Sequence, residues 1–137
     1  MQMSTFLKQY FLTFAIFLVL DAIWLGTIAP GFYQSQIGFL MAKNPIWAAA
    51  GFFYLLFVVG LVVFVVSPAV QQSSLRVAVL KGALFGLVTY ATYDLTNLAT
   101  IEGWPVLVTA VDLVWGSFLS TATATVSAWL LLRKRKA

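Results

Sequence analysis

Four long runs of apolar residues fill most of the chain, at about residues 5–29, 45–66, 75–101 and 105–132. Each run is long enough for a helix that crosses the hydrocarbon core of a bilayer, which needs about 20 residues. The pattern predicts an all-α integral membrane protein, a four-helix transmembrane bundle in which residues 1–137 form one domain. Because Asp21 interrupts the first run, we expect this run to be retained as a span and not cleaved as a secretory signal.

Proline and glycine mark the predicted ends of the first two spans. Pro30-Gly31 is expected to stop the first helix, and Ser67-Pro68 is expected to end the second. Asn44-Pro45 places a capping residue before a proline at the first helical position, so the second span is expected to begin there. Residues 32–43 connect the two spans as either a short helix in the membrane interface or an ordinary loop, and the sequence favours neither.

Basic residues gather on one side of the predicted bundle. Lys8, Arg76, Lys81 and the run 133–136 fall on one side, and Lys43 alone falls on the other. By the positive-inside rule, both termini are expected to be cytoplasmic. The terminal run holds half of the 8 basic residues and directly follows a hydrophobic helix, which is typical of an anchor on an anionic membrane surface. We therefore expect the lipid bilayer, and no nucleic acid, as the partner of these charges.

Composition excludes several classes of chemistry. The chain is 62% hydrophobic and only 9% charged, too few polar residues to cover a soluble globule. It has no cysteine, which excludes disulfides and thiolate sites. It has no histidine, which excludes Ser-His-Asp catalysis and a histidine-ligated haem. Any proton chemistry must therefore use Asp, Glu, Tyr or Lys.

Three carboxyl groups are predicted at one depth in the membrane. Asp21, Asp94 and Asp112 each lie about seven residues from the outer end of a predicted helix, or roughly 10 Å deep at the helical rise. No basic residue in the outer half of a span can neutralise them. They must be protonated, accept hydrogen bonds or hold a cation. Together they would suit a divalent cation such as Mg²⁺, Ca²⁺ or Mn²⁺, the one cofactor that the sequence indicates.

Aromatic and polar residues accompany the acids. Asp94 shares a helical stripe with a tyrosine four residues before it and an asparagine three residues after it, and a tryptophan follows each of the other two acids by three residues. A cationic organic ligand caged by the two tryptophans is an alternative to a metal. Structural hydrogen bonding is a further interpretation, weakened by the need to neutralise three like charges. The candidate ligand-binding residues are Asp21, Trp24, Tyr90, Tyr93, Asp94, Asn97, Asp112 and Trp115.

Five strings in order along the chain are distinctive: residues 20–26 (LDAIWLG), 53–54 (FY) with Gly60, 67–69 (SPA), 90–100 (YATYDLTNLAT) and 111–116 (VDLVWG). Through them the chain resembles, over essentially its whole length, a family of bacterial predicted membrane proteins filed as domain of unknown function 2177, and the fourth string is specific. The resemblance implies a four-span protein of the bacterial inner membrane. It directs attention to the aspartates and their aromatic neighbours, implies no activity and assigns none of these residues a role.

Three functions stay open at this point. The leading hypothesis is a small protein that binds or transports a cation, a proton or a small lipophilic molecule through an acidic, aromatic-lined pocket in the periplasmic half. A homodimer would help to enclose a path, and Gly82 and Gly86 are candidate contacts because a Gly-x-x-x-Gly pair allows close helix approach. The second is an intramembrane enzyme that uses paired aspartates on a lipid or isoprenoid. The third is a non-catalytic membrane assembly or stress-related subunit.

Overall fold

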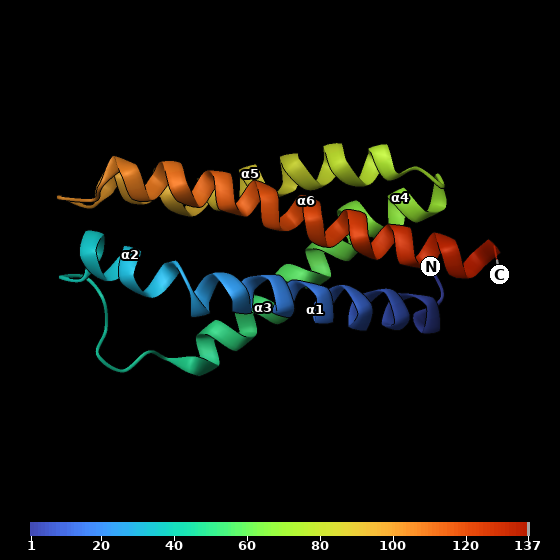
Figure 1. Ribbon diagram of the computed structural model, residues 1–137, viewed down its shortest axis with the longest axis horizontal. Helices are drawn as coiled ribbons and strands as arrows, with labels where there is room; N and C mark the ends of the chain where they lie inside the picture. The colour runs from blue at the N-terminus through green and yellow to red at the C-terminus, as the bar shows by residue number, and fades with distance from the viewer. Residues whose placement is uncertain (137) are drawn as a thin grey trace.

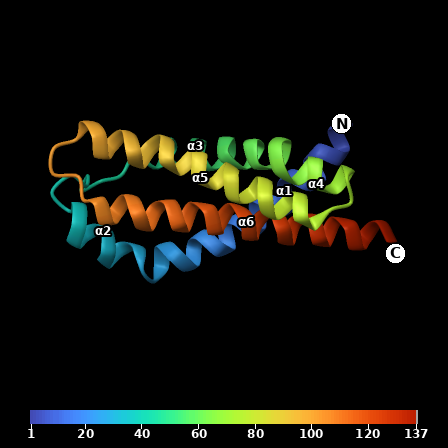
Figure 2. The same cartoon turned by 90° about the horizontal axis from the view of Figure 1, so that it is seen from above.

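The computed structural model describes residues 1–136, and within them all regular structure is helical. Four candidate spans cover Met3–Gly26, Trp47–Gln71, Leu75–Thr100 and Val106–Arg135. This confirms the predicted four-helix membrane protein. The spans lie along the long axis of an elongated bundle, and both chain termini lie at the same end (Figure 1 and Figure 2). We call this end the terminal end and the opposite end the distal end.

The first span is the helix α1 (Met3–Gly26), and a short helix, α2 (Ala29–Ile37), follows it at the distal end. The prediction that Pro30-Gly31 stops the first helix is wrong. The helix already ends at Gly26, and Pro30 lies in the first turn of α2, where a missing N–H leaves no hydrogen bond unmade. Of the two alternatives for the connection, the short helix is correct over residues 29–37.

The second span consists of α3 (Trp47–Leu61), the π-helical turn η1 (Val62–Val66) and α4 (Ser67–Gln71). The prediction that Ser67-Pro68 ends this span is therefore wrong. Proline cannot donate to the carbonyl four residues earlier, and its ring would clash with that carbonyl in a regular α-helix. The wider π turn directly before Pro68 interrupts the regular series of backbone hydrogen bonds at this point, so that the helix continues past the proline. The span crosses the bundle at an angle, so that the start of α3 lies away from the other helices (Figure 1).

The third and fourth spans, α5 (Leu75–Thr100) and α6 (Val106–Lys136), form the main packing pair of the bundle. Two glycines of α5 bring the backbones together. A Cβ on Gly82 would lie 2.9 Å from the Cα of Thr121, and one on Gly86 would lie 2.8 Å from the Cα of Ser117. The Gly-x-x-x-Gly pair therefore packs inside one chain, and its predicted role as a dimer contact is wrong.

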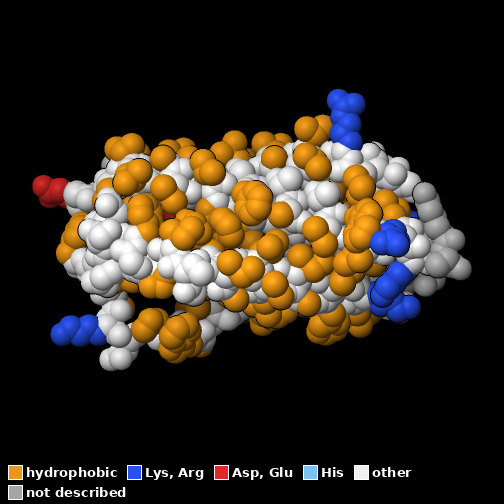
Figure 3. Space-filling model, in the orientation of Figure 1, with side chains coloured by type: hydrophobic (Ala, Val, Ile, Leu, Met, Phe, Trp, Pro, Cys, Tyr) orange, Lys and Arg blue, Asp and Glu red, His pale blue; other side chains and the backbone are white. Residues whose placement is uncertain are grey.

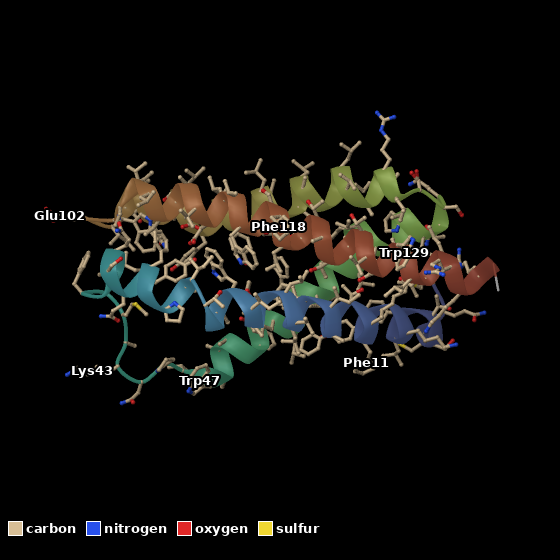
Figure 4. The ribbon with its side chains drawn as sticks, in the orientation of Figure 1. Phe11, Lys43, Trp47, Glu102, Phe118 and Trp129 are labelled. Atoms are coloured by element: carbon tan, nitrogen blue, oxygen red, sulfur yellow. The ribbon has the colours of Figure 1, made fainter. Side chains whose placement is uncertain are left out.

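On the face drawn in Figure 3, hydrophobic side chains are spread over the surface between the two ends, as expected of a surface that faces lipid. Phe11 and Phe118 point outward from the bundle and are 64% and 57% exposed (Figure 4). Lys43 and Glu102 extend from the distal end, whereas most basic side chains visible in Figure 3 gather at the terminal end. There Arg135 donates a hydrogen bond to the carbonyl of Val70 at 3.1 Å. Placement of the terminal end in the cytoplasm stays a prediction from this charge distribution.

We expect Gly86→Ala to destabilise the bundle, since the added methyl group would press on the backbone of α6. Overpacking of this kind costs about 1–3 kcal/mol, more than the roughly 1 kcal/mol that alanine gains in helix propensity. Thermal unfolding in detergent would show a lower melting temperature. The matched control is Gly51→Ala, where the methyl group would meet no described atom within 4 Å. A stability loss in the control as large as at Gly86 would contradict this account.

Candidate acidic and aromatic site

Asp21 of α1 accepts a hydrogen bond from the phenol of Tyr54 on α3. Its side chain is only 6% exposed. The indole of Trp115 on α6 lies near this carboxyl group, but its N–H makes no hydrogen bond to any residue in the range 1–136. The ring of Phe17 stands edge-on to that of Tyr54, with 5.3 Å between the ring centroids, and holds the phenol in place. A phenol thus replaces the basic partner that Asp21 lacks in sequence.

Asp112 of α6 accepts a hydrogen bond from the phenol of Tyr33 on α2. Burial of Tyr33 and this hydrogen bond raise the pKa of the phenol above its ordinary value, so the hydroxyl stays a donor at neutral pH. The short helix that connects the first two spans therefore contributes a side chain to the bundle interior. Its role is to bring a neutral donor to a buried carboxyl group.

Asp94 of α5 is fully buried, and neither of its carboxyl oxygens has a hydrogen-bond partner among residues 1–136. Its carboxyl group interacts with that of Asp112. The backbone around it is fixed, because the hydroxyl of Thr109 donates to the carbonyl of Asp94 at 3.3 Å and Trp104 donates to that hydroxyl at 3.1 Å. Two neighbouring carboxylates repel each other strongly when both are ionised. The pair therefore needs a shared proton or a bound cation.

Tyr90 lies among all three acids. It is close enough to Asp21, Asp94 and Asp112 for their charges to act on its phenol. Its ring packs directly on Gly116, where a side chain would not fit, and stands edge-on to Phe57. The predicted acids therefore converge around one tyrosine: Asp94 and Asp112 form a pair, and Asp21 lies near Tyr90 with its own phenol donor.

The two tryptophans do not form the predicted cage. Trp24 and Trp115 stack on each other, with ring centroids 4.5 Å apart and ring planes 12° apart. Their facing surfaces are thus occupied by each other, which leaves no room for a cation between them. Tyr93 and Asn97 lie at the edge of the site. Tyr93 is 57% exposed and stands edge-on to Trp104.

The three aspartates do not gather into one metal site. Within the part of the chain that the structure describes, no group of three or more His, Cys, Asp or Glu side chains is placed to hold a metal ion. The reason is the rotation of α1, which directs Asp21 to Tyr54 of α3 rather than to the Asp94–Asp112 pair. The set Asp21, Asp94 and Asp112 is therefore not assembled as metal ligands in this conformation.

A cavity of about 340 Å³ adjoins the acids on the side of α3. Its walls come from α3, α5 and α6, and five of its six lining residues are aromatic or hydroxyl-bearing: Phe53, Phe57, Thr89, Tyr90 and Tyr93. The sixth is Asp112, the one carboxylate of the lining. α3 has hardly any backbone contact with α5, whereas its continuation through η1 and α4 packs against α5. The cavity therefore lies where the second span leaves the third.

A family model described as "Predicted membrane protein (DUF2177)" matches residues 6–129. The chain belongs to this family. The match confirms the resemblance that the sequence strings indicated. It includes most of the first and fourth spans, all of the second and third, and the whole candidate site. Searches of curated proteins and of solved structures gave no match.

Two tyrosines of the site were missed in the sequence of this DUF2177 protein. Tyr33 lies in the connection, where the pattern gave no preference between helix and loop. Tyr54 lies in an apolar run, and its ring looked like one more aromatic residue of a span. The one available signal was chemical. A phenol inside a membrane helix needs a hydrogen-bond partner, and the unpaired carboxyl groups of this chain are the natural acceptors.

We expect Tyr54→Phe to lower the free energy of unfolding by about 1–3 kcal/mol, because the Asp21 carboxyl group would lose its phenol donor while staying buried. A double-mutant cycle with Asp21→Leu, followed by thermal or denaturant unfolding, isolates the interaction. In the Asp21→Leu background, Tyr54→Phe should change the free energy of unfolding only slightly, because the acceptor of the phenol is gone. Tyr93→Phe is the matched control on an exposed tyrosine, and an equal loss there would contradict the assignment.

Proposed function

We propose that this protein binds a small lipophilic molecule with a positive charge, in the cavity beside Asp112, in the outer half of the bacterial inner membrane. The observation that carries the proposal is the lining of that cavity: aromatic walls with a single carboxylate, backed by a second acid that has no donor among residues 1–136. Transport of such a molecule, or of a simple cation or proton, would use the same site.

The cavity has the size and chemistry of a small-molecule site. Its volume of about 340 Å³ falls at the lower end of the range of roughly 300–1,000 Å³ that such sites occupy. Phe53 and Phe57 provide apolar surface, and the faces of Tyr90 and Tyr93 are favourable to a cation. A positive charge beside Asp112 would also relieve the repulsion within the Asp94–Asp112 pair. A neutral ligand would lack this contribution.

The position of the cavity favours entry from the bilayer. It lies between the second and third spans where their backbones separate, so its opening would face the acyl chains. A lipophilic molecule already partitioned into the membrane would reach it without crossing the polar surface. The positive-inside rule places the cavity nearer the periplasmic face. A homodimer is not required for this binding, and no contact surface for one follows from Gly82 or Gly86.

The adjacent carboxyl groups support a second candidate function. An Asp94–Asp112 pair that shares one proton could act as acid and base on a lipid or isoprenoid held in the same cavity. Turnover of such a lipid by the purified protein, lost in both Asp94→Asn and Asp112→Asn, would favour this enzyme. Binding without turnover would favour the first function.

We expect benzyltrimethylammonium to bind the detergent-purified protein saturably. At one hundred times its Kd it should raise the free energy of unfolding by about 2.7 kcal/mol, which a higher melting temperature would show. Neopentylbenzene, its uncharged isostere, should bind at least tenfold more weakly. Asp112→Asn should weaken the binding of the cation at least tenfold, a loss of about 1.4 kcal/mol.

The matched control is Glu102→Gln, which removes an exposed acid at the distal end and should change nothing. Mg²⁺, Ca²⁺ and Mn²⁺ belong in the same titration. Binding of one of them that depends on Asp112 would indicate that the ligand is a simple cation and not an organic one. Equal binding of the cation and its isostere, or an equal loss in Glu102→Gln, would overturn it.

A further inference from the structure

The buried face of α1 is mostly polar. Its four buried residues are spaced four apart along the helix: Gln9, Thr13, Phe17 and Asp21. A helix inside a membrane bundle usually buries small or apolar residues, because an unpaired polar group in a low-dielectric interior is costly. Three polar residues out of four on this face therefore need an explanation beyond packing.

A matching polar face runs along α6. Ser120, Thr123 and Ser127 are all 0% exposed and continue the face that begins at Asp112. α1 packs on α6 and runs antiparallel to it. The Trp24–Trp115 stack and the proximity of Asp21 to Trp115 indicate a register in which Thr13 is about level with Thr123 and Gln9 with Ser127. We call the combined face the polar seam: Gln9, Thr13, Asp21, Asp112, Ser120, Thr123 and Ser127.

Several groups of the polar seam lack a partner. The side-chain oxygens of Gln9, Thr13, Ser120 and Thr123 are buried and make no hydrogen bond to any residue in the described range 1–136. Several other helical hydroxyls donate to the carbonyl four residues earlier, as Thr121 does at 2.6 Å and as Ser127 of the seam itself does at 2.7 Å. Since buried polar groups that the protein does not satisfy are commonly satisfied by ordered water, the seam has the chemistry of a hydrated path.

Two apolar side chains divide the polar seam near its middle. Phe17 on α1 is 1% exposed and Leu119 on α6 is 0% exposed, and the same register places them level with each other. They separate the acids from the hydroxyls nearer the terminal end. We propose that the polar seam is a water-accessible path through which protons from the terminal end reach Asp21 and Asp112, closed in this conformation at Phe17 and Leu119. The path does not depend on what the cavity binds.

The first test uses cysteine as a probe of water, and the chain has no cysteine of its own. Thr13→Cys and Thr123→Cys in lipid nanodiscs should react with a positively charged, water-soluble methanethiosulfonate, because only a hydrated thiol ionises to the reactive thiolate. The matched controls Ala15→Cys and Val126→Cys lie at similar depths on exposed, lipid-facing positions. They should react at least tenfold more slowly. Equal rates at the seam and lipid-facing positions would overturn the proposal.

The second test removes the side chains that are proposed to close the polar seam. Phe17→Ala and, independently, Leu119→Ala should raise proton flux into liposomes loaded with a pH-sensitive dye at least fivefold above wild type, and adding Thr13→Val should reverse the increase. Phe85→Ala is the control, since this ring packs against Phe57 and Phe64 of the second span and not on the seam. Flux in the Phe17 and Leu119 variants no higher than in the control would overturn a proton path. Neither test uses the cavity ligand, so failure here is separate from failure of the proposed function.

Discussion

The bundle is built around three carboxyl groups that lie in its interior without a basic partner. Each requires another way to be neutralised or solvated. Asp21 accepts a hydrogen bond from a phenol of α3 and Asp112 accepts one from a phenol of α2, whereas Asp94 has no donor among residues 1–136 and lies beside the Asp112 carboxyl group. Because these partners come from different elements, the acids tie together α1, α2, α3, α5 and α6. Removing a donor would therefore act on the arrangement of the bundle as well as on one local contact.

The close packing of α5 and α6 allows the acids to meet. Gly82 and Gly86 let the backbones approach near the middle of the membrane, and Gly116 accepts the ring of Tyr90 directly on its Cα. This contact places Asp94 against Asp112. The second span, by contrast, crosses at an angle and continues past Pro68 through a π turn. The pair α5 and α6 is thus closely packed, whereas the second span diverges from α5. The cavity lies between them on this side, and Asp112 is part of its lining.

The sequence predicted those features that follow from hydropathy and depth. The four spans follow from the lengths of the apolar runs, whereas the common depth of the acids stays a prediction from their distance to the predicted helix ends. Features that depend on helix rotation and on local backbone geometry could not be predicted. Sequence alone could not show that Asp21 turns to Tyr54, that Tyr33 turns inward from a connecting helix, or that Trp24 and Trp115 stack on each other. The prediction that Pro68 ends the second span was wrong because a π turn before a proline allows a helix to continue past it.

The position of Asp112 connects the two proposals. It lines the cavity on one side and begins the polar seam of α6 on the other. A carboxyl group can be neutralised by a proton or by a neighbouring organic cation, and each reduces the affinity for the other by the same factor. If the seam supplies protons from the terminal end and the cavity receives a cation from the bilayer, the two occupants exchange at one residue. Such exchange needs the seam to be closed while the cation is bound, and Phe17 and Leu119 stand where that closure is required.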